Sequence, residues 1–528
     1  MKKLTGWKII LVLVVGGVAR GADFPFAEAT IDGLQARMAA GTLTAHALTA
    51  AYLARIAAVD RAGPKLNAII ELNPDALAIA DALDAERKAG RVRGPLHGIP
   101  VLIKDNIATA DRMETTAGSL ALVGAKPAHD APLVARLRDA GAVLLGKTNL
   151  SEWANFRSSS STSGWSGRGG QTHNPYALDR NPSGSSSGSA VAVAANLCVV
   201  AVGTETDGSI VSPASISGIV GVKPTVGLVS RTGIIPISVS QDTAGPMART
   251  VRDAAILLSV IAGTDPADPA TTARPPPAAP ASPATLPAGA LKGARLGIVR
   301  GPFHFHPRMD ALLTELVAAL RAAGAEVVDP LDMPVVDQLG KPEGLVLHYE
   351  FKAGLNAWFA SLGAQAPVKS LADLIAFNDA HRAQEMPFFA QEELIDAQGR
   401  GPLTDQAYLD AVALSRRLAR TEGIDATMDA HTLDALVTLT SGPAWLTDPV
   451  NGDHYTGDTT TLAAVAGYPH VTVPATQVFG LPVGLSFVGR AWSEAKLLAL
   501  AADFEARTHA RREPQFLPTI AVPGAGAR

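Results

Sequence analysis

The residues best suited to chemistry in this sequence are hydroxyl groups in two glycine-containing segments. Residues 181–189 (NPSGSSSGS) form a serine-rich stretch that runs directly into an apolar helical segment, which a flexible linker would not do. Residues 204–209 (TETDGS) follow the apolar run 199–202 and precede a segment, 210–217, that can be helical. A serine placed where a strand turns into a helix has an exposed hydroxyl and free backbone N–H groups nearby, which suits a nucleophile for acyl transfer. The pattern therefore indicates a candidate nucleophile.

Lys104 is the third candidate, because it ends the strand-like run 98–103. A lysine at the tip of a buried strand either pairs with a carboxylate or loses its charge, since burial disfavours the ammonium form. Asp105 is the nearest carboxylate in sequence, but adjacent residues of a strand point to opposite faces. Two alternatives therefore stay open: an ion pair, or a neutral amine that accepts a proton near neutral pH.

Two other motifs fail to meet the requirements of the sites that their spacing suggests. Residues 141–148 have the spacing of a P-loop, but the residues between the two glycines are Ala-Val-Leu-Leu, which favour a strand, and a helix precedes them. We therefore expect Lys147 at the end of a strand. His304 and His306 alternate as metal ligands could, but prolines bracket them and no third ligand is near, so a surface turn is predicted.

The elements that must position these residues predict an α/β fold. Short β runs alternate with Ala-rich helices through the middle of the chain, which favours a large mixed, mainly parallel twisted sheet covered by helices on both faces. We expect a single domain over residues 23–522. Its parts are a helical N-terminal region (23–95), a core (96–265), a Pro/Ala-rich linker (272–290), a helical region that could form a pocket wall (340–430) and a return to the sheet (431–522), followed by a tail (523–528).

Composition excludes several classes of protein. Apolar residues make up 47% of the chain and charged residues 18%, so the chain as a whole is not disordered. The 45 Lys and Arg residues are scattered and are outnumbered by 49 Asp and Glu residues, which argues against a nucleic-acid partner. Cys198 is the only cysteine and lies in an apolar run, so we interpret it as a buried hydrophobic residue and exclude a disulfide framework.

The N-terminal segment has the layout of a secretory signal peptide. Lys2, Lys3 and Lys8 precede the apolar run 9–19, and small residues follow at positions 21 and 22. An apolar run of this length is shorter than the roughly 20 residues that a spanning helix needs. We therefore predict that residues 1–22 are removed and that the protein is exported, periplasmic or secreted, with no stable membrane association. An uncleaved anchor is the alternative.

Several motifs together resemble the amidase signature family of Ser-cisSer-Lys hydrolases. They occur in the family's order and cover most of the chain apart from the linker and residues 340–430. The matching segments are LHGIPVLIKDN (96–106), GKTNLSEWA (146–154), the serine-rich stretch, GIVGVKPT (218–225), AGYPHVTVP (466–474) and GLPVGLSFVGR (480–490).

The resemblance implies a role for each candidate. Ser209 would be the nucleophile, Ser185 the serine that follows a cis peptide bond from Gly184, and Lys104 the terminal base. It further implies an oxyanion hole of backbone N–H groups from Thr206, Asp207, Gly208 and Ser209, and a supporting loop that includes Gly184, Ser186 and Ser187. No metal or organic cofactor is implied.

Within that family, residues 204–211 and 227–237 look most like peptide amidases. Those enzymes hydrolyse the C-terminal carboxamide of a peptide to a free acid and ammonia. The sequence departs from the commoner family pattern at Ser183, Ser187, Glu205, Asp207 and Val211, where Gly, Gly, Asp, Gly and Arg are usual. We expect a peptide or small-molecule amide as substrate. The alternatives are aryl or fatty amides, an amidotransferase A subunit that uses ammonia on charged tRNA, which an export signal argues against, and, from another class, an exported solute-binding protein.

Overall fold

The computed structural model describes residues 24–273, 286–301 and 307–520. The predicted signal peptide (1–22), the His304 and His306 turn and the tail (523–528) lie outside the described residues, as does most of the Pro/Ala-rich linker. In the ranges that are described, every helix is too short or too polar to cross a bilayer.

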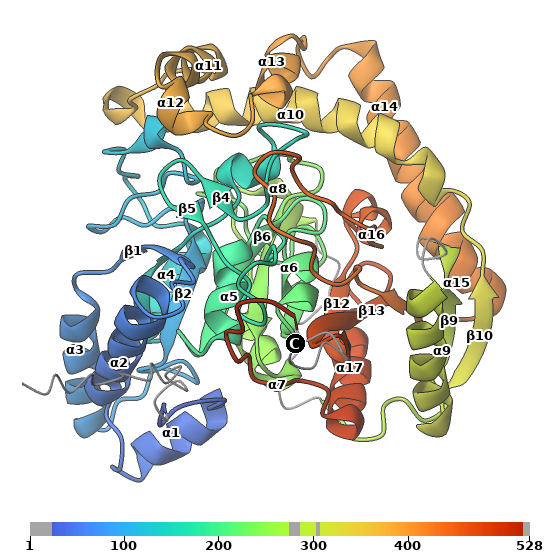
Figure 1. The fold of residues 1–528 in the computed structure, drawn as a ribbon, viewed down its shortest axis with the longest axis horizontal. Coiled ribbons are helices and arrows are strands. Elements are labelled where there is room, and N and C mark those ends of the chain that lie inside the picture. Colours follow the sequence, from blue (N-terminus) through green and yellow to red (C-terminus); the bar gives the residue numbers. More distant parts are fainter. Residues whose placement is uncertain (1–23, 274–285, 302–306, 521–528) are drawn as a thin grey trace, which may run out of the picture.

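An eleven-stranded sheet forms the centre of the described chain (Figure 1). Its strand order is β1-β3-β2-β6-β8-β7-β12-β13-β11-β9-β10, and β4 (Trp165–Ser166) pairs with β5 (Gly170–Gln171) in a separate hairpin. The strands are β1 (Ile69–Leu72), β2 (Pro100–Lys104), β3 (Val143–Thr148), β6 (Val200–Glu205), β7 (Val220–Lys223), β8 (Thr243–Ala248), β9 (Arg295–Val299), β10 (Glu326–Leu331), β11 (Ala435–Leu439), β12 (His470–Val478) and β13 (Leu481–Val488).

The predicted mixed sheet is confirmed, but parallel pairing is confined to its two flanks. Strands β3, β2 and β6 are parallel at one side, and β11, β9 and β10 are parallel at the other. The strands between them pair antiparallel, so the parallel share is smaller than the sequence suggested. One reason is that β12 and β13 are joined by the tight turn at Phe479 and Gly480, which makes them a hairpin.

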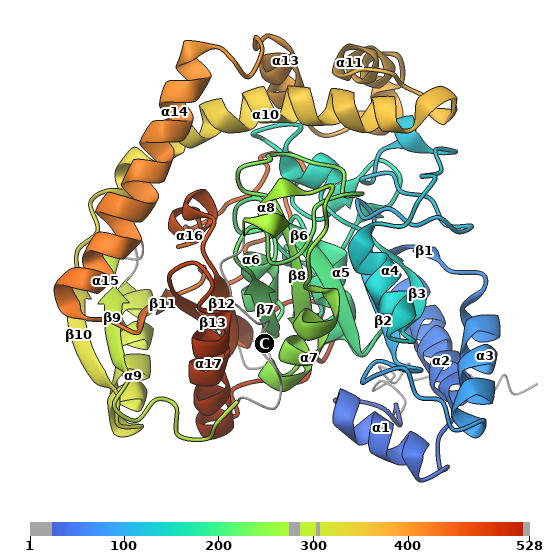
Figure 2. The same cartoon turned by 180° about the vertical axis from the view of Figure 1, so that it is seen from behind.

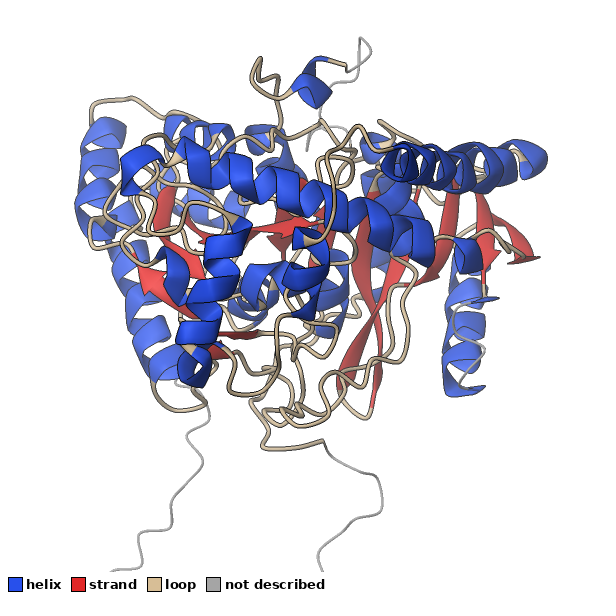
Figure 3. Ribbon diagram, turned by 90° about the horizontal axis from the view of Figure 1, so that it is seen from above, coloured by secondary structure: helices blue, strands red, loops and turns tan. Residues whose placement is uncertain are grey.

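Helices cover both faces of the sheet, as Figure 3 shows with strands in red between helices in blue. Helices α5 and α6 pack on one face, and α7 and α17 pack on the other. The helices outside residues 340–430 are α1 (Ile31–Ala39), α2 (Ala45–Arg55), α3 (Ala76–Lys88), α4 (Pro132–Asp139), α5 (Ser187–Ala194), α6 (Val211–Ile216), α7 (Val251–Ile261), α8 (Pro269–Thr272), α9 (Pro307–Ala322), α16 (Thr461–Ala466) and α17 (Glu494–Thr508).

The N-terminal region is helical as predicted, with one exception. Strand β1 interrupts it and forms one edge of the sheet, pairing antiparallel with β3. A strand of four residues leaves too short a pattern for periodicity to distinguish it from a helix. Cys198 is fully buried and unpaired, and Lys147 lies in β3, as expected.

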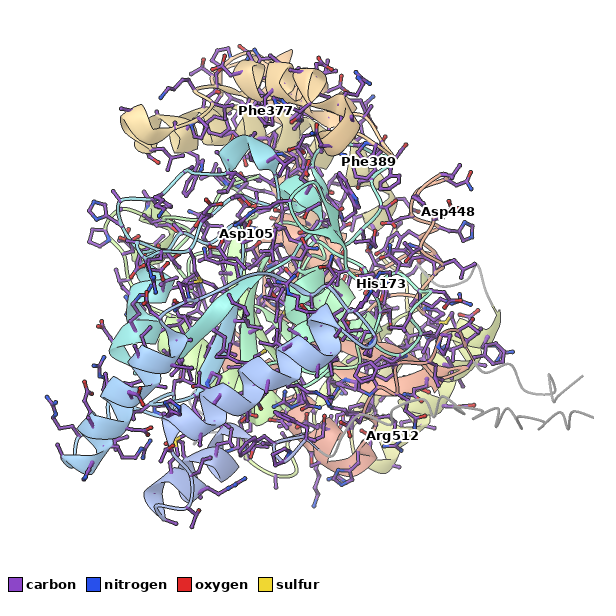
Figure 4. The ribbon with its side chains drawn as sticks, turned by 60° about the vertical axis from the view of Figure 1, so that its left-hand side comes forward. Asp105, His173, Phe377, Phe389, Asp448 and Arg512 are labelled. Carbon is purple, nitrogen blue, oxygen red and sulfur yellow. The ribbon has the colours of Figure 1, made fainter. Side chains whose placement is uncertain are left out.

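Residues 340–430, here called the helical arm, run along one side of the sheet and around its end (Figure 2). Phe377 and Phe389 mark the arm in Figure 4. Its aromatic residues Tyr349, Phe351, Trp358 and Phe389 are buried. The arm comprises α10 (Gly340–Ser361), α11 (Leu371–Ala380), α12 (Arg382–Glu385), α13 (Glu392–Gln398), α14 (Gln406–Arg416), a π-helix (Arg417–Ile424) and α15 (Asp425–His431).

Candidate active site

The amine of Lys104 lies at the carboxyl end of β2, beside the carboxyl end of its parallel neighbour β6. Its Nζ donates to Ser185 Oγ at 2.8 Å, to Ser186 Oγ at 3.0 Å and to the carbonyl of Thr204 at 3.2 Å. Lys104 is completely buried, and desolvation lowers the pKa of its amine to about 7, against the opposing influence of the Asp242 and Glu205 carboxylates. The amine is therefore neutral in much of the population just above neutral pH.

Asp105 is not the partner of Lys104. Its carboxylate instead accepts hydrogen bonds from Thr116 and from the N–H of Gly118, and it lies 3.5 Å from Arg168. Asp105, labelled in Figure 4, is fully buried. The alternation of side chains along a strand separates the two neighbours, so the ion-pair alternative within this dipeptide is wrong.

The serine-rich loop is the element that carries Ser185 to the lysine. The peptide bond between Gly184 and Ser185 is cis, as the family resemblance implied. The carbonyl of Ser185 accepts from the N–H of Ser151 at 3.1 Å, and Ser187 Oγ donates to the carbonyl of Ser183 at 2.6 Å. Ser185, Ser186 and Ser187 are all fully buried. The loop is therefore fixed by its own hydroxyl groups rather than exposed as a linker would be.

Ser209 lies in the turn between β6 and α6. Gly208 has a φ of +75°, and a side chain there would meet Thr460, so the turn requires glycine. The carbonyl of Ser209 accepts from the N–H of Ser186 at 3.1 Å, which joins this turn to the serine-rich loop. The structure thus brings the segments of Lys104, Ser185 and Ser209 together, although they are far apart in the sequence.

The same turn presents several backbone donors. The Glu205 carboxylate accepts from the N–H groups of Ile210 and Val211 at 2.7 and 3.0 Å, and so caps the start of α6. Among the residues that the structure describes, the N–H groups of Asp207, Gly208 and Ser209 donate to no acceptor. This leaves them available to an oxygen atom of a bound molecule.

Ser209 opens into a cavity of ≈ 410 Å³. Its lining includes Gly184, Asp207, Trp445, Asp453 and Tyr455. From the helical arm, only Leu347 is among the described residues at this wall, so loop 443–458 contributes more to the pocket than the arm does. The sequence did not indicate that loop, because its residues match no motif and it follows the strand without helical periodicity.

Asp453 holds the loop against the serine-rich segment. Its carboxylate accepts from the N–H of Ser163, from Asn181 Nδ2 at 3.0 Å and from Trp445 Nε1 at 3.0 Å. These bonds fix one wall of the cavity.

A group of carboxyls behind the turn was also missed in the sequence. Asp207 accepts from Thr461 Oγ1 at 2.7 Å and lies against Glu343 of α10, and burial raises the pKa of both carboxyls. Burial and the charge of Asp207 raise the pKa of Asp458 to about 7. Because Asp207 faces this group, its side chain is held by neighbours other than the N–H donors of the turn. In the described residues no cluster of His, Cys, Asp and Glu is arranged to hold a metal ion.

Comparison with known proteins gives one consistent result. A family model described as amidase matches residues 47–498. A protein of Arabidopsis thaliana named probable amidase is 42% identical over 519 residues, covering 96% of each chain. The X-ray structure of native peptide amidase from Stenotrophomonas maltophilia is 58% identical with a TM-score of 0.90, covering 93% of this chain and 99% of that one. The crystal structure of an amidase family protein from Bacillus anthracis str. Ames is 37% identical with a TM-score of 0.83, covering 93% of each chain.

If Lys104 accepts a proton during turnover, activity should rise with pH. The lysine can act as a base only after losing its own proton, so kcat/KM should increase through a midpoint near the pKa of about 7 and then level off. The measurement is kcat/KM on an amide substrate from pH 5 to 9, with circular dichroism at each pH to show that the fold persists. A flat profile over this range would rule out the lysine as base.

Proposed function

Because the chain belongs to the amidase family, we propose that it hydrolyses the C-terminal carboxamide of peptides to a free carboxylic acid and ammonia. The chain is an amidohydrolase, and the peptide substrate is the specific part of this proposal. It is supported by the 58% identity to the peptide amidase of Stenotrophomonas maltophilia and to a structure of a peptide amidase in complex with the competitive inhibitor chymostatin. The amidase relatives also exclude the solute-binding alternative.

The observation that carries the mechanism is the 2.8 Å hydrogen bond from the buried Lys104 amine to Ser185, beside the turn that holds Ser209. In the first step Ser209 attacks the carbonyl carbon of the amide. Its proton passes to Ser185, whose own proton passes to neutral Lys104. The substrate oxygen becomes an oxyanion that the N–H groups of residues 206–209 stabilise, and losing one such donor typically costs about 3 kcal/mol.

The second step reverses the direction of the proton. The carbon–nitrogen bond breaks as Ser185 donates a proton to the leaving nitrogen and recovers one from the Lys104 ammonium. Ammonia departs and an acyl ester on Ser209 remains. Water then attacks this ester with the same two residues carrying its proton, which releases the acid and restores the free serine.

The surroundings of Ser209 fit a substrate longer than a simple amide. A second cavity of ≈ 680 Å³ shares Trp445 and Asp453 with the cavity at Ser209. Its lining is largely apolar and includes Leu446 and Phe479. We propose that the residues preceding the amide extend from Ser209 towards this second cavity.

The variant Ser209→Ala tests the nucleophile. Removing the attacking oxygen should lower kcat by at least about 10⁴-fold while leaving the thermal unfolding temperature close to that of the wild type. Ser259→Ala is a matched control, because Ser259 lies in α7 and its hydroxyl donates only to the carbonyl of Ile256. Full turnover by the Ser209 variant would end the proposal. Labelling of Ser209 by a serine-directed phosphonate gives independent support.

A substrate panel tests the peptide specificity. Amidated peptides of two to five residues, free amino acid amides, an aryl amide, a fatty amide and glutamine are compared by ammonia release. We expect kcat/KM to be highest for the amidated peptides, because their preceding residues can contact the second cavity. A preference for the aryl or fatty amide would replace the peptide assignment while keeping amide hydrolysis, and glutamine as sole substrate would favour an amidotransferase role.

We also propose that the enzyme is exported, on the pattern of Lys2, Lys3 and Lys8 before the apolar run 9–19. Expressed with its N-terminus intact in a bacterial host, the chain should be found outside the cytoplasm. Mass spectrometry of the exported protein should place its first residue near Ala22 or Asp23. An intact N-terminus on cytoplasmic protein would contradict export, and an intact N-terminus in the membrane fraction would support the anchor instead.

A further inference from the structure

Asp242 accepts a hydrogen bond from the start of the turn that contains Ser209, although none of the catalytic steps above uses Asp242. The residue directly precedes β8, whose first residue, Thr243, pairs with Glu205 of β6. Asp242 Oδ1 accepts from Thr206 Oγ1 at 2.6 Å. Its Oδ2 accepts from the N–H groups of Ile237 and Ser238, both at 2.9 Å. Three donors therefore fix the carboxylate.

The neighbouring residue, Gln241, also binds Thr206. Gln241 Nε2 donates to the carbonyl of Thr206 at 3.4 Å and to Glu343 Oε1 at 2.8 Å. Thr206 is thus held by its side chain and its carbonyl at the point where β6 gives way to the N–H donors of the turn. A shift at Thr206 would move those donors relative to the oxygen atom that they are placed to receive.

Asp242 also acts on the lysine through its charge. The carboxylates that favour the ammonium form of Lys104 are those of Asp242 and Glu205, and Glu205 is already engaged by the N–H groups at the start of α6. Arg231 is the cation that acts on Asp242 besides the lysine, and it is bound bidentately to Asp268. Desolvation raises the pKa of Asp242 to about 6, so this carboxylate is ionised where Lys104 is neutral.

The segment around Asp242 is anchored to the helical arm. Glu350 of α10 accepts from Ser238 Oγ at 2.5 Å, from the N–H of Ser240 at 2.9 Å and from Tyr408 OH of α14 at 2.7 Å. The arm therefore fixes the segment that fixes Asp242.

From these contacts we infer that Asp242 is a positioning residue for amide hydrolysis: it orients the oxyanion turn through Thr206 and stabilises the Lys104 ammonium that each proton transfer creates. The inference rests on the proposed function. Asp242 forms no bond to the substrate and stays ionised throughout. It acts on Lys104 through its charge and on Thr206 through a hydrogen bond.

Asp242→Asn removes the charge and keeps the shape of the side chain. Without the carboxylate the ammonium form of Lys104 is less favoured, so the rise of kcat/KM should move to lower pH, by about one unit. The value of kcat at its plateau should fall about ten- to a hundredfold because the turn and the transient ammonium both lose support. Thr206→Val removes only the hydrogen bond, so it should lower kcat while leaving the midpoint where it is in the wild type.

Asp253→Asn is the matched control. Asp253 in α7 is also a buried aspartate, it accepts from the N–H of Ile31 at 3.1 Å, and burial raises its pKa to about 6. Its variant should lose thermal stability without moving the midpoint. If Asp242→Asn does not fold, Asp242→Glu supplies the test, because it retains the charge and should keep the wild-type midpoint at a lowered kcat.

The outcomes separate this inference from the proposed function. If the wild type hydrolyses amides and Asp242→Asn has the same plateau kcat and the same midpoint as the wild type, the role of Asp242 is overturned. A shifted midpoint in Asp242→Glu or in Asp253→Asn would overturn it as well. If the wild type releases no ammonia from any amide, the proposed function has failed before Asp242 is tested.

Discussion

The structure depends on one buried amine that has hydroxyl and carbonyl neighbours but no directly bonded carboxylate. Lys104 donates to two serines and to the carbonyl of Thr204, so its hydrogen bonds are satisfied while its charge is not neutralised by an ion pair. Burial lowers the pKa of this amine towards neutrality, which a direct salt bridge would prevent. Asp105 instead lies against Arg168 and Thr116, so this neighbouring carboxylate forms no ion pair with the Lys104 amine.

Two other buried lysines, Lys147 and Lys223, can be compared with Lys104. Lys147 donates to the carbonyl of Ile107, and Lys223 donates to the carbonyl of Tyr468, both at 2.6 Å. Each lies at or near the end of a strand, as Lys104 does, and desolvation lowers the pKa of each amine to about 8. What distinguishes Lys104 is its hydrogen bond to Ser185, in the loop that also bonds to the turn of Ser209. Three lysines are fully buried in the described residues, and Lys147 also donates to a hydroxyl, that of Thr115 at 2.9 Å, so the link to the serine-rich loop is what sets Lys104 apart.

The sequence predicted the α/β class, and it pointed to Lys104 and to the turn of Ser209 as parts of the candidate site, because each of these leaves a local signal. The strand that ends at Lys104 and the turn from β6 to α6 could be read from apolar runs and glycine. Ser185 as relay and the cis bond came from the resemblance, since no property of the serine stretch alone distinguishes one hydroxyl from the next. Strand β1 was missed because four residues are too few for a periodic pattern.

The residues that the sequence did not reveal act through contacts between distant segments. Asp453 binds Asn181, Glu343 lies against Asp207, and Asp242 holds Thr206, each across an interval that only the folded chain closes. Nothing in the local sequence separates these carboxylates from the many aspartates and glutamates at the surface. Their side-chain partners are set by tertiary packing, which periodicity does not report.

The attachment of the helical arm has a consequence for redesign. Glu350 binds Ser238 and Ser240, while Glu392 binds Ser158 and the N–H of Ser159. These carboxylates bind serine-bearing loops of the core, and they add to the packing of arm residues such as Phe351 and Phe359 in the main hydrophobic core. A chimaera that imported the equivalent helices of another enzyme would therefore have to reproduce both these carboxylates and the apolar face that packs on the core.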